Sequence, residues 1–218
     1  MKRFAFALIV LASVTTLAQT PAPWQIYGGF QYTRLDTASV QDAVDLAALQ
    51  AGVPTINFGR HQNLYGWCFG GQQNLNSWFG GIVDVGGTYL TKRVLLAQSG
   101  GVNATLRARL HSYTLMAGPQ ITLRRSSIFQ PFVRALVGGG FFDDSVNVLV
   151  NNVPQFRETK ESDENWAFGG GVGTDVNFSH SLGLRIAVDY IRTQLFNENQ
   201  DNYRGTASLV YRFGGTRK

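Results

Sequence analysis

Residues 203–213 (YRGTASLVYRF) constrain the fold most, because they alternate in character with a period of two. Apolar, aromatic or small side chains occupy one set of alternate positions, and the other set is polar or basic except for one valine. Successive side chains of a β-strand point to opposite faces, so one face here suits hydrocarbon and the other suits water or ion pairs. A strand of about ten residues can cross a bilayer at a tilt. A soluble sandwich or barrel also contains such strands, so the interpretation depends on repetition.

The first 18 residues have the organisation of a secretory signal peptide. Lys2 and Arg3 precede an apolar run over residues 4–14, and small residues flank a cleavage site after Ala18. The apolar run is too short for a transmembrane helix. We therefore expect residues 1–18 to be removed on export and residues 19–218 to form a single domain.

Composition narrows the class of protein further. Without Lys2 and Arg3, the 19 basic residues become 17 against 14 acidic ones, which is weak evidence for a nucleic-acid partner, and we expect none. Cys68 is the only cysteine, so an exported chain of this kind has no internal disulfide, and a closed sheet would hold it together instead. Alternating strands also explain how a chain with 44% hydrophobic residues has no long apolar run after the signal.

Period-two patterns occur in eight segments, and the connections between them alternate in length. The segments are residues 24–35, 64–74, 78–90, 108–123, 129–142, 166–178, 182–195 and 203–213, of which 64–74 alternates poorly. Residues 74–77, 124–127 and 179–181 are short turns, whereas residues 36–63, 91–107 and 143–165 are long connections and residues 196–202 a smaller one. Outer-membrane barrels place short turns on the periplasmic side and long loops outside. The pattern predicts an all-β fold, an eight-stranded antiparallel transmembrane up-and-down β-barrel, with a short helix over residues 40–50 of the first loop.

Two sets of residues follow from this fold. Aromatic residues near the strand ends are expected at the membrane interfaces: Trp24, Tyr32, Phe79, Tyr89, Trp166, Phe178, Tyr190, Tyr203 and Phe213. Charged residues on the opposite faces are expected in the lumen: Asp84, Arg134, Asp175, Arg185, Asp189, Arg204 and Arg212. Buried charges must pair, so we expect ion pairs that fill the narrow barrel. A narrow ion path gated by these pairs is the alternative.

Several segments resemble the strands of the small eight-stranded outer-membrane barrels of the OmpA-like transmembrane type. These are WFGGIVDVGGTY (78–89), SYTLMAGPQITL (112–123), IFQPFVRALVGGGF (128–141) and AFGGGVGTDVNFS (167–179). The resemblance implies a bacterial outer-membrane location, contact with outer-membrane lipids, and assembly by machinery that reads the final aromatic residue, here Phe213. The chain departs from the family by continuing for five residues beyond it.

Catalysis is not expected, because His61, His111 and His180 have no serine or cysteine at a recognisable motif spacing. No catalytic, cofactor or metal site is predicted. The function indicated is a structural or surface-interaction role, adhesion-like, in which loops such as residues 143–165 reach an extracellular partner. A small ion-conducting channel and a soluble periplasmic ligand-binding barrel remain as alternatives.

Overall fold

A computed structural model describes residues 22–37, 41, 45–46, 59–99, 102–150, 153–157, 161–195 and 198–214. The predicted signal peptide lies outside the described residues. The strands are β1 (Trp24–Asp36), β2 (His61–Asn74), β3 (Phe79–Ser99), β4 (Val102–Thr122), β5 (Phe129–Val150), β6 (Val153–Arg157), β7 (Glu161–Asn177), β8 (Leu182–Leu195) and β9 (Glu198–Phe213). No helix among the described residues is long and apolar enough to span a membrane.

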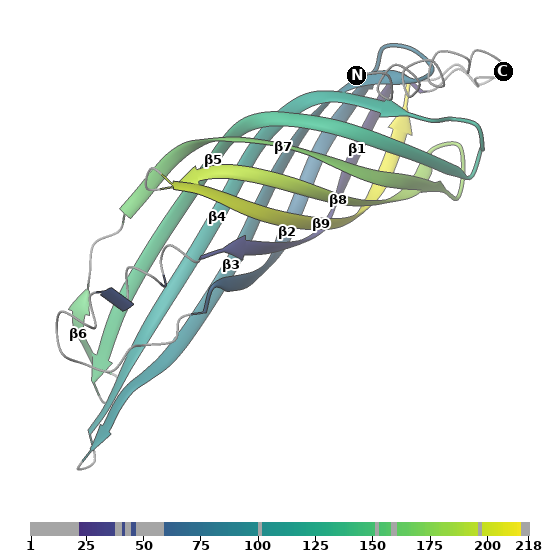
Figure 1. Cartoon of the computed structure of the whole chain (residues 1–218). Coiled ribbons are helices and arrows are strands. Elements are labelled where there is room, and N and C mark those ends of the chain that lie inside the picture. The colour runs from purple at the N-terminus through teal and green to yellow at the C-terminus, as the bar shows by residue number, and fades with distance from the viewer. Residues whose placement is uncertain are drawn as a thin grey trace.

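Eight of these strands close into an antiparallel barrel (Figure 1). Each barrel strand pairs with its neighbours along the chain, β9 returns to β1, and β4 pairs with β5, so the sheet has no free edge within the barrel. The short strand β6 pairs only with the far end of β5 and lies outside this cycle. The predicted eight-stranded antiparallel barrel is confirmed.

One end of the barrel, here called the turn end, carries the three short connections, residues 75–78, 123–128 and 178–181. The start of β1 and the finish of β9 lie there too, because Trp24 pairs with Phe213. Backbone hydrogen bonds link successive turns around this rim: Asn74 N to Pro23 O, Thr122 N to Trp78 O, Asn177 N to Ile128 O, and Arg212 N to Ser181 O. The turns are thus part of one hydrogen-bonded ring.

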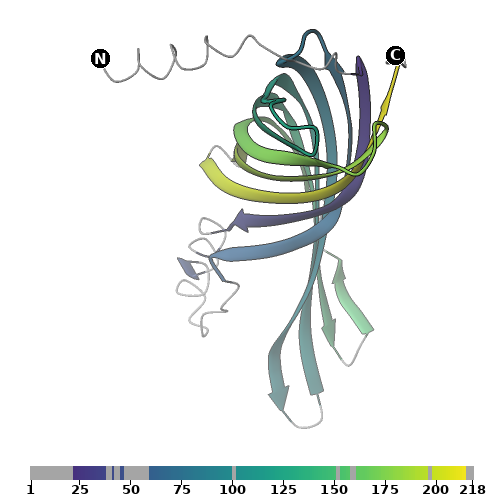
Figure 2. The same ribbon diagram turned by 90° about the vertical axis from the view of Figure 1, so that its right-hand side faces the viewer.

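The opposite end, here called the extension end, differs from the sequence prediction. The predicted long connection over residues 91–107 is wrong, because β3 and β4 continue as a hairpin to Ser99 and Val102, far beyond the barrel (Figure 2). Likewise, residues 143–165 contain the outer third of β5, the strand β6 and the start of β7, and β9 already begins within residues 196–202. The prediction limited each strand to a membrane-crossing length, but these backbone groups continue to pair across the ladder. In the first connection, Gln41, Asp45 and Leu46 are helical, and the rest of residues 38–58 lies outside the described residues.

Side chains alternate between the two barrel faces as the period-two pattern requires. In β2, which was predicted to alternate poorly, Tyr65, Trp67 and Phe69 are exposed outside, and Leu64 and Cys68 are buried inside. The glycines of this strand hide the alternation in the sequence, because they carry no side chain on either face.

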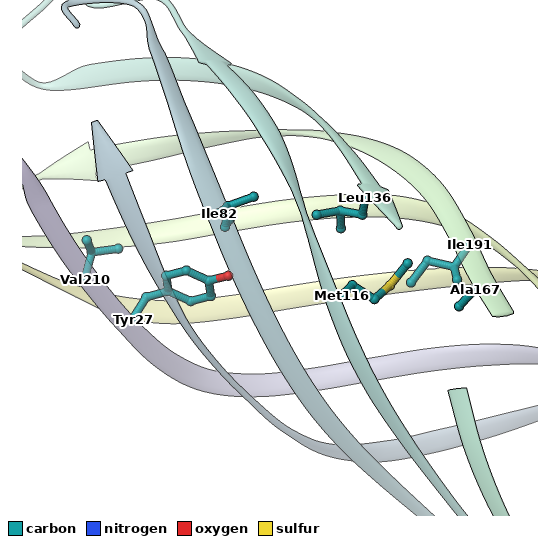
Figure 3. Packing of buried hydrophobic residues seen from close by; sticks show 7 residues of the cluster. All are labelled: Tyr27, Ile82, Met116, Leu136, Ala167, Ile191 and Val210. Atoms are coloured by element: carbon teal, nitrogen blue, oxygen red, sulfur yellow. The ribbon is translucent and has the colours of Figure 1, made fainter. Parts of the chain in front are cut away.

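The barrel interior also holds apolar side chains. One cluster of buried residues comes from seven strands and comprises Tyr27, Ile82, Met116, Leu136, Ala167, Ile191 and Val210 (Figure 3). A second lies toward the extension end, where buried Leu35 and Leu64 pack with the partly buried Leu90 and Leu110. Small and large apolar groups therefore occupy the lumen together with the charges described next.

Candidate functional site in the barrel interior

All seven charged residues predicted for the lumen lie inside the barrel and are at most 8% exposed: Asp84, Arg134, Asp175, Arg185, Asp189, Arg204 and Arg212. The sequence could not assign partners, because pairing depends on the register of strands far apart in the chain. The structure divides them into two clusters, named here the central cluster (Asp84, Arg134, Asp189 and Arg204) and the turn-end cluster (Asp175, Arg185 and Arg212).

The central cluster is electrically balanced and closely bonded. Arg134 donates Nε and Nη2 to the two carboxylate oxygens of Asp189, each at 2.7 Å. Arg204 donates Nε to Asp189 Oδ2 at 2.9 Å and Nη1 to Asp84 Oδ1. Tyr27 donates its hydroxyl to Asp84 Oδ2 at 2.7 Å. Paired and hydrogen-bonded in this way, two arginines and two aspartates can be buried without an uncompensated charge.

The turn-end cluster is arranged around Asp175. Arg185 donates Nε to Asp175 Oδ1 at 2.7 Å and Nη2 to Oδ2 at 2.9 Å, and the same Nη2 reaches Gln72 Oε1 at 2.7 Å. Arg212 makes a longer bond from Nη2 to Asp175 Oδ2, 3.3 Å. Two guanidinium groups thus share one carboxylate, and this cluster has an excess of positive charge.

Aromatic rings lie between the two clusters. The guanidinium carbon of Arg185 is 4.7 Å from the ring centroid of Tyr27 and 4.9 Å from that of Phe132, and Arg134 is 5.8 Å from Phe132. The negative face of an aromatic ring attracts a cation, and the attraction is stronger where water is excluded. These two rings therefore help to hold the arginines in place.

Sequence reasoning missed the neutral members of the site. Tyr27, Phe132, Gln25 and Gln72 all face the lumen and contact the charges. The sequence contained a signal for them, because each of these residues occupies one of the alternate strand positions whose side chains face the lumen. None of the four carries a charge, so the pattern of charged residues does not include them.

The outer surface carries the nine aromatic residues predicted for the membrane interfaces, all exposed or partly exposed. They fall near the two barrel ends: Trp24, Phe79, Phe178 and Phe213 near the turn end, and Tyr32, Tyr89, Trp166, Tyr190 and Tyr203 toward the extension end. Rings of the second group contact one another, as in the pair Tyr190–Tyr203 with centroids 5.7 Å apart. Trp24 and Tyr32 are eight residues apart on β1, which is about 26 Å along a strand and about 20 Å of height at the usual tilt. This separation suits the apolar part of a membrane, and the interfacial position of the rings remains a prediction.

The three histidines lie apart from one another. His61 begins β2, His111 lies in β4 with its ring 5.3 Å from that of Tyr89, and His180 is in the turn before β8. Within the described ranges, no group of three or more His, Cys, Asp or Glu residues could hold a metal ion. Cys68 is buried with its Sγ 3.1 Å from Ser208 Oγ.

Comparison with known proteins agrees with this architecture. Ail, the attachment invasion locus protein of Yersinia pestis, superposes with a TM-score of 0.54 at 14% identity, covering 88% of this chain and 99% of Ail. Neisserial surface protein A superposes with a TM-score of 0.53 at 9% identity, covering 88% of this chain and 97% of that protein. No match to a curated protein sequence was found. The family model described as the outer membrane protein beta-barrel domain matches residues 4–213, so this chain belongs to the family of outer-membrane β-barrel proteins.

Proposed function

We propose that this protein is a closed, non-conducting outer-membrane barrel that acts at the cell surface through its extension end, in a structural or adhesion-like role without catalysis. The observation that carries the first part is the filled lumen. Two layers of ion pairs and two groups of apolar side chains occupy the space that a channel would leave open. The interior of an eight-stranded barrel is just wide enough for its own side chains to fill.

The small-channel alternative requires an open path past the central cluster. Asp84, Arg134, Asp189 and Arg204 are each at most 5% exposed and bonded to one another across the lumen from β3, β5, β8 and β9. Opening a path would break several charge-assisted hydrogen bonds at once. The soluble-barrel alternative does not agree with membership of the outer-membrane family, nor with the many exposed apolar side chains of the outer wall.

Support for a surface role comes from the β3–β4 hairpin. Barrels of this family keep short turns in the periplasm, which puts the extension end outside the cell. Residues 91–109 contain four basic residues, Lys92, Arg93, Arg107 and Arg109, and no acidic one. Arg93 lies opposite Arg107 in the register of the β3–β4 ladder, so the hairpin brings basic positions of both strands to the same level. We therefore expect this hairpin to contact an anionic polymer at the cell surface.

The solved relatives are consistent with contact between the hairpin and an anionic polymer. Ail is named for attachment and invasion, and one of its crystal structures is a complex with the heparin analogue sucrose octasulfate. That ligand belongs to Ail, whose identity to this chain is low. It makes heparin a practical probe, whereas the reason for the proposal is the basic hairpin.

Two experiments test the proposal. In planar bilayers, the full-length refolded barrel should show no discrete conductance steps, and regular steps from the wild type would refute the closed lumen. For the surface role, cells displaying the barrel should bind heparin-coated beads, and the Arg93→Gln/Arg107→Gln variant should bind fewer. Arg192→Gln/Arg34→Gln removes the same charge from outside the hairpin and is the control. Equal loss in both variants would mean that general surface charge, rather than the hairpin, causes the binding.

A further inference from the structure

The barrel opens at its turn end into a cavity with an excess of positive charge. The cavity has a volume of about 460 Å³, its lining includes Arg124, Arg212, His180, Gln130 and Asn177, and none of the described residues that line it carries a carboxylate. Asp175, the acid nearest to these arginines, lies deeper and is already bound to Arg185 and Arg212. The mouth of the barrel therefore carries an excess of positive charge, whereas the charges of the central cluster balance.

Arg124 lies at this mouth because the β4–β5 turn fixes it there. Its Nη1 donates to the backbone carbonyl of Ser77, and its Nη2 donates to Asn74 Oδ1 at 2.8 Å, so the neighbouring turn positions the guanidinium. Burial, together with repulsion from Arg212 and Arg185, lowers the pKa of Arg124 to about 10, although attraction to Asp175 opposes this. The side chain remains protonated at neutral pH.

Arg212 has unused hydrogen-bonding capacity at the same place. The residue is only 8% exposed, and its one bond to Asp175 is 3.3 Å long. Its Nη1 is buried and has no partner among the described residues. Arg212 also lines the cavity, so an anion bound there would lie beside a guanidinium whose charge is only partly offset by Asp175.

We propose that the turn-end mouth binds a phosphate group, carried by a small phosphorylated molecule of the periplasm or by a lipid headgroup, between Arg124 and Arg212. Three arginines, Arg124, Arg185 and Arg212, face one aspartate, which leaves two positive charges. A phosphate monoester carries about 1.5 to 2 negative charges at neutral pH, which matches this excess. The planar fork of arginine suits the oxygens of a phosphate.

The first test is calorimetric titration of the refolded full-length protein in detergent with inorganic phosphate and with glycerol 3-phosphate. Saturable binding is expected, and Arg124→Gln should weaken it by about tenfold or more, because one charged donor is lost. Arg192→Gln removes the same charge at the extension end and should leave binding unchanged. Gln130→Glu places a carboxylate in the cavity and should abolish binding. Gln130→Glu keeps the test possible if Arg124→Gln does not fold, because we expect an added carboxylate beside the arginines to be tolerated.

The second arm distinguishes the source of the phosphate. The protein is placed in nanodiscs that contain phosphatidic acid, whose headgroup is a phosphate monoester, and retained lipid is counted by native mass spectrometry. Retention that Arg124→Gln and Gln130→Glu remove, without binding of the soluble anions, would support the site with a lipid headgroup as its ligand. The proposal is overturned if neither soluble phosphate nor lipid is held, or if all variants bind as the wild type does.

Discussion

Asp189→Asn is the most informative single change in this molecule. Asp189 is fully buried and accepts three hydrogen bonds, two from Arg134 and one from Arg204. Asparagine has nearly the same shape but no charge and only one oxygen. The substitution therefore leaves two buried guanidinium groups facing the single charge of Asp84.

The expected loss follows from this geometry. An asparagine oxygen in the place of Oδ2 can retain at most two of the three bonds, so at least one charge-assisted bond is lost and one positive charge becomes uncompensated. Removing one partner of a buried ion pair costs about 3 to 5 kcal/mol. With a urea dependence of about 3 kcal/mol per molar, the unfolding midpoint should fall by about 1 to 2 M.

The assay is urea unfolding of the protein in lipid vesicles, followed by tryptophan fluorescence. The control is Asp201→Asn, which removes a carboxylate from the exposed pair with Arg192, where the ion pair contributes little. A paired replacement, Asp189→Leu with Arg134→Met, should recover most of the stability because Asp84 and Arg204 then balance each other. If Asp189→Asn unfolds at the same urea concentration as Asp201→Asn, the central cluster does not stabilise the barrel and the reasoning fails.

Four further outcomes are expected. Gly171→Ala should lower the thermal unfolding temperature, because a Cβ there would collide with the Asp189 carboxylate and the Val188 carbonyl. The control is Gly81→Ala, whose Cβ would meet nothing within 4 Å, and equal effects of the two variants would contradict the prediction. Val188→Arg, on the outer wall at mid-strand, should cost about 2 to 4 kcal/mol in vesicle unfolding relative to Val188→Leu if that wall faces lipid. Cys68, only 2% exposed, should react with a maleimide only after denaturation, and rapid labelling of the folded barrel would show an open lumen. Phe213→Ala should reduce the fraction of heat-modifiable, assembled protein in outer membranes, and unchanged assembly would mean that the machinery does not read this residue.

The strands could be predicted from the sequence because the side chains on the two faces of each barrel strand differ in character. Val83 and Val85 alternate with Ile82 and Asp84, and this pattern is local enough to read directly. Strand ends toward the extension end were less predictable. Residues such as Val94 and Leu95 continue to pair beyond the length that a membrane requires, and nothing in a local pattern says where a ladder stops.

The lumen residues could be identified in the same way, but their partners could not. Arg134 and Asp189 are 55 positions apart and lie on strands that are not neighbours in the sheet. Their contact depends on the closure of the barrel and on the register of every ladder between them. The role of Tyr27 depends on the same geometry, because its hydroxyl on β1 reaches Asp84 on β3, past the intervening strand β2.

The placement of charge inside the barrel follows from the cost of burying it. The central cluster lies inside the barrel, where its four residues are at most 5% exposed, and it contains as many aspartates as arginines. The excess positive charge of the interior lies instead with Arg212 and Arg124 at the turn end, where a cavity opens toward the aqueous side. A barrel with more lumen arginines than aspartates can tolerate the surplus only near a mouth. The balanced pairs thus fill the deep interior of the barrel, whereas Arg124 and Arg212 line the cavity at its mouth.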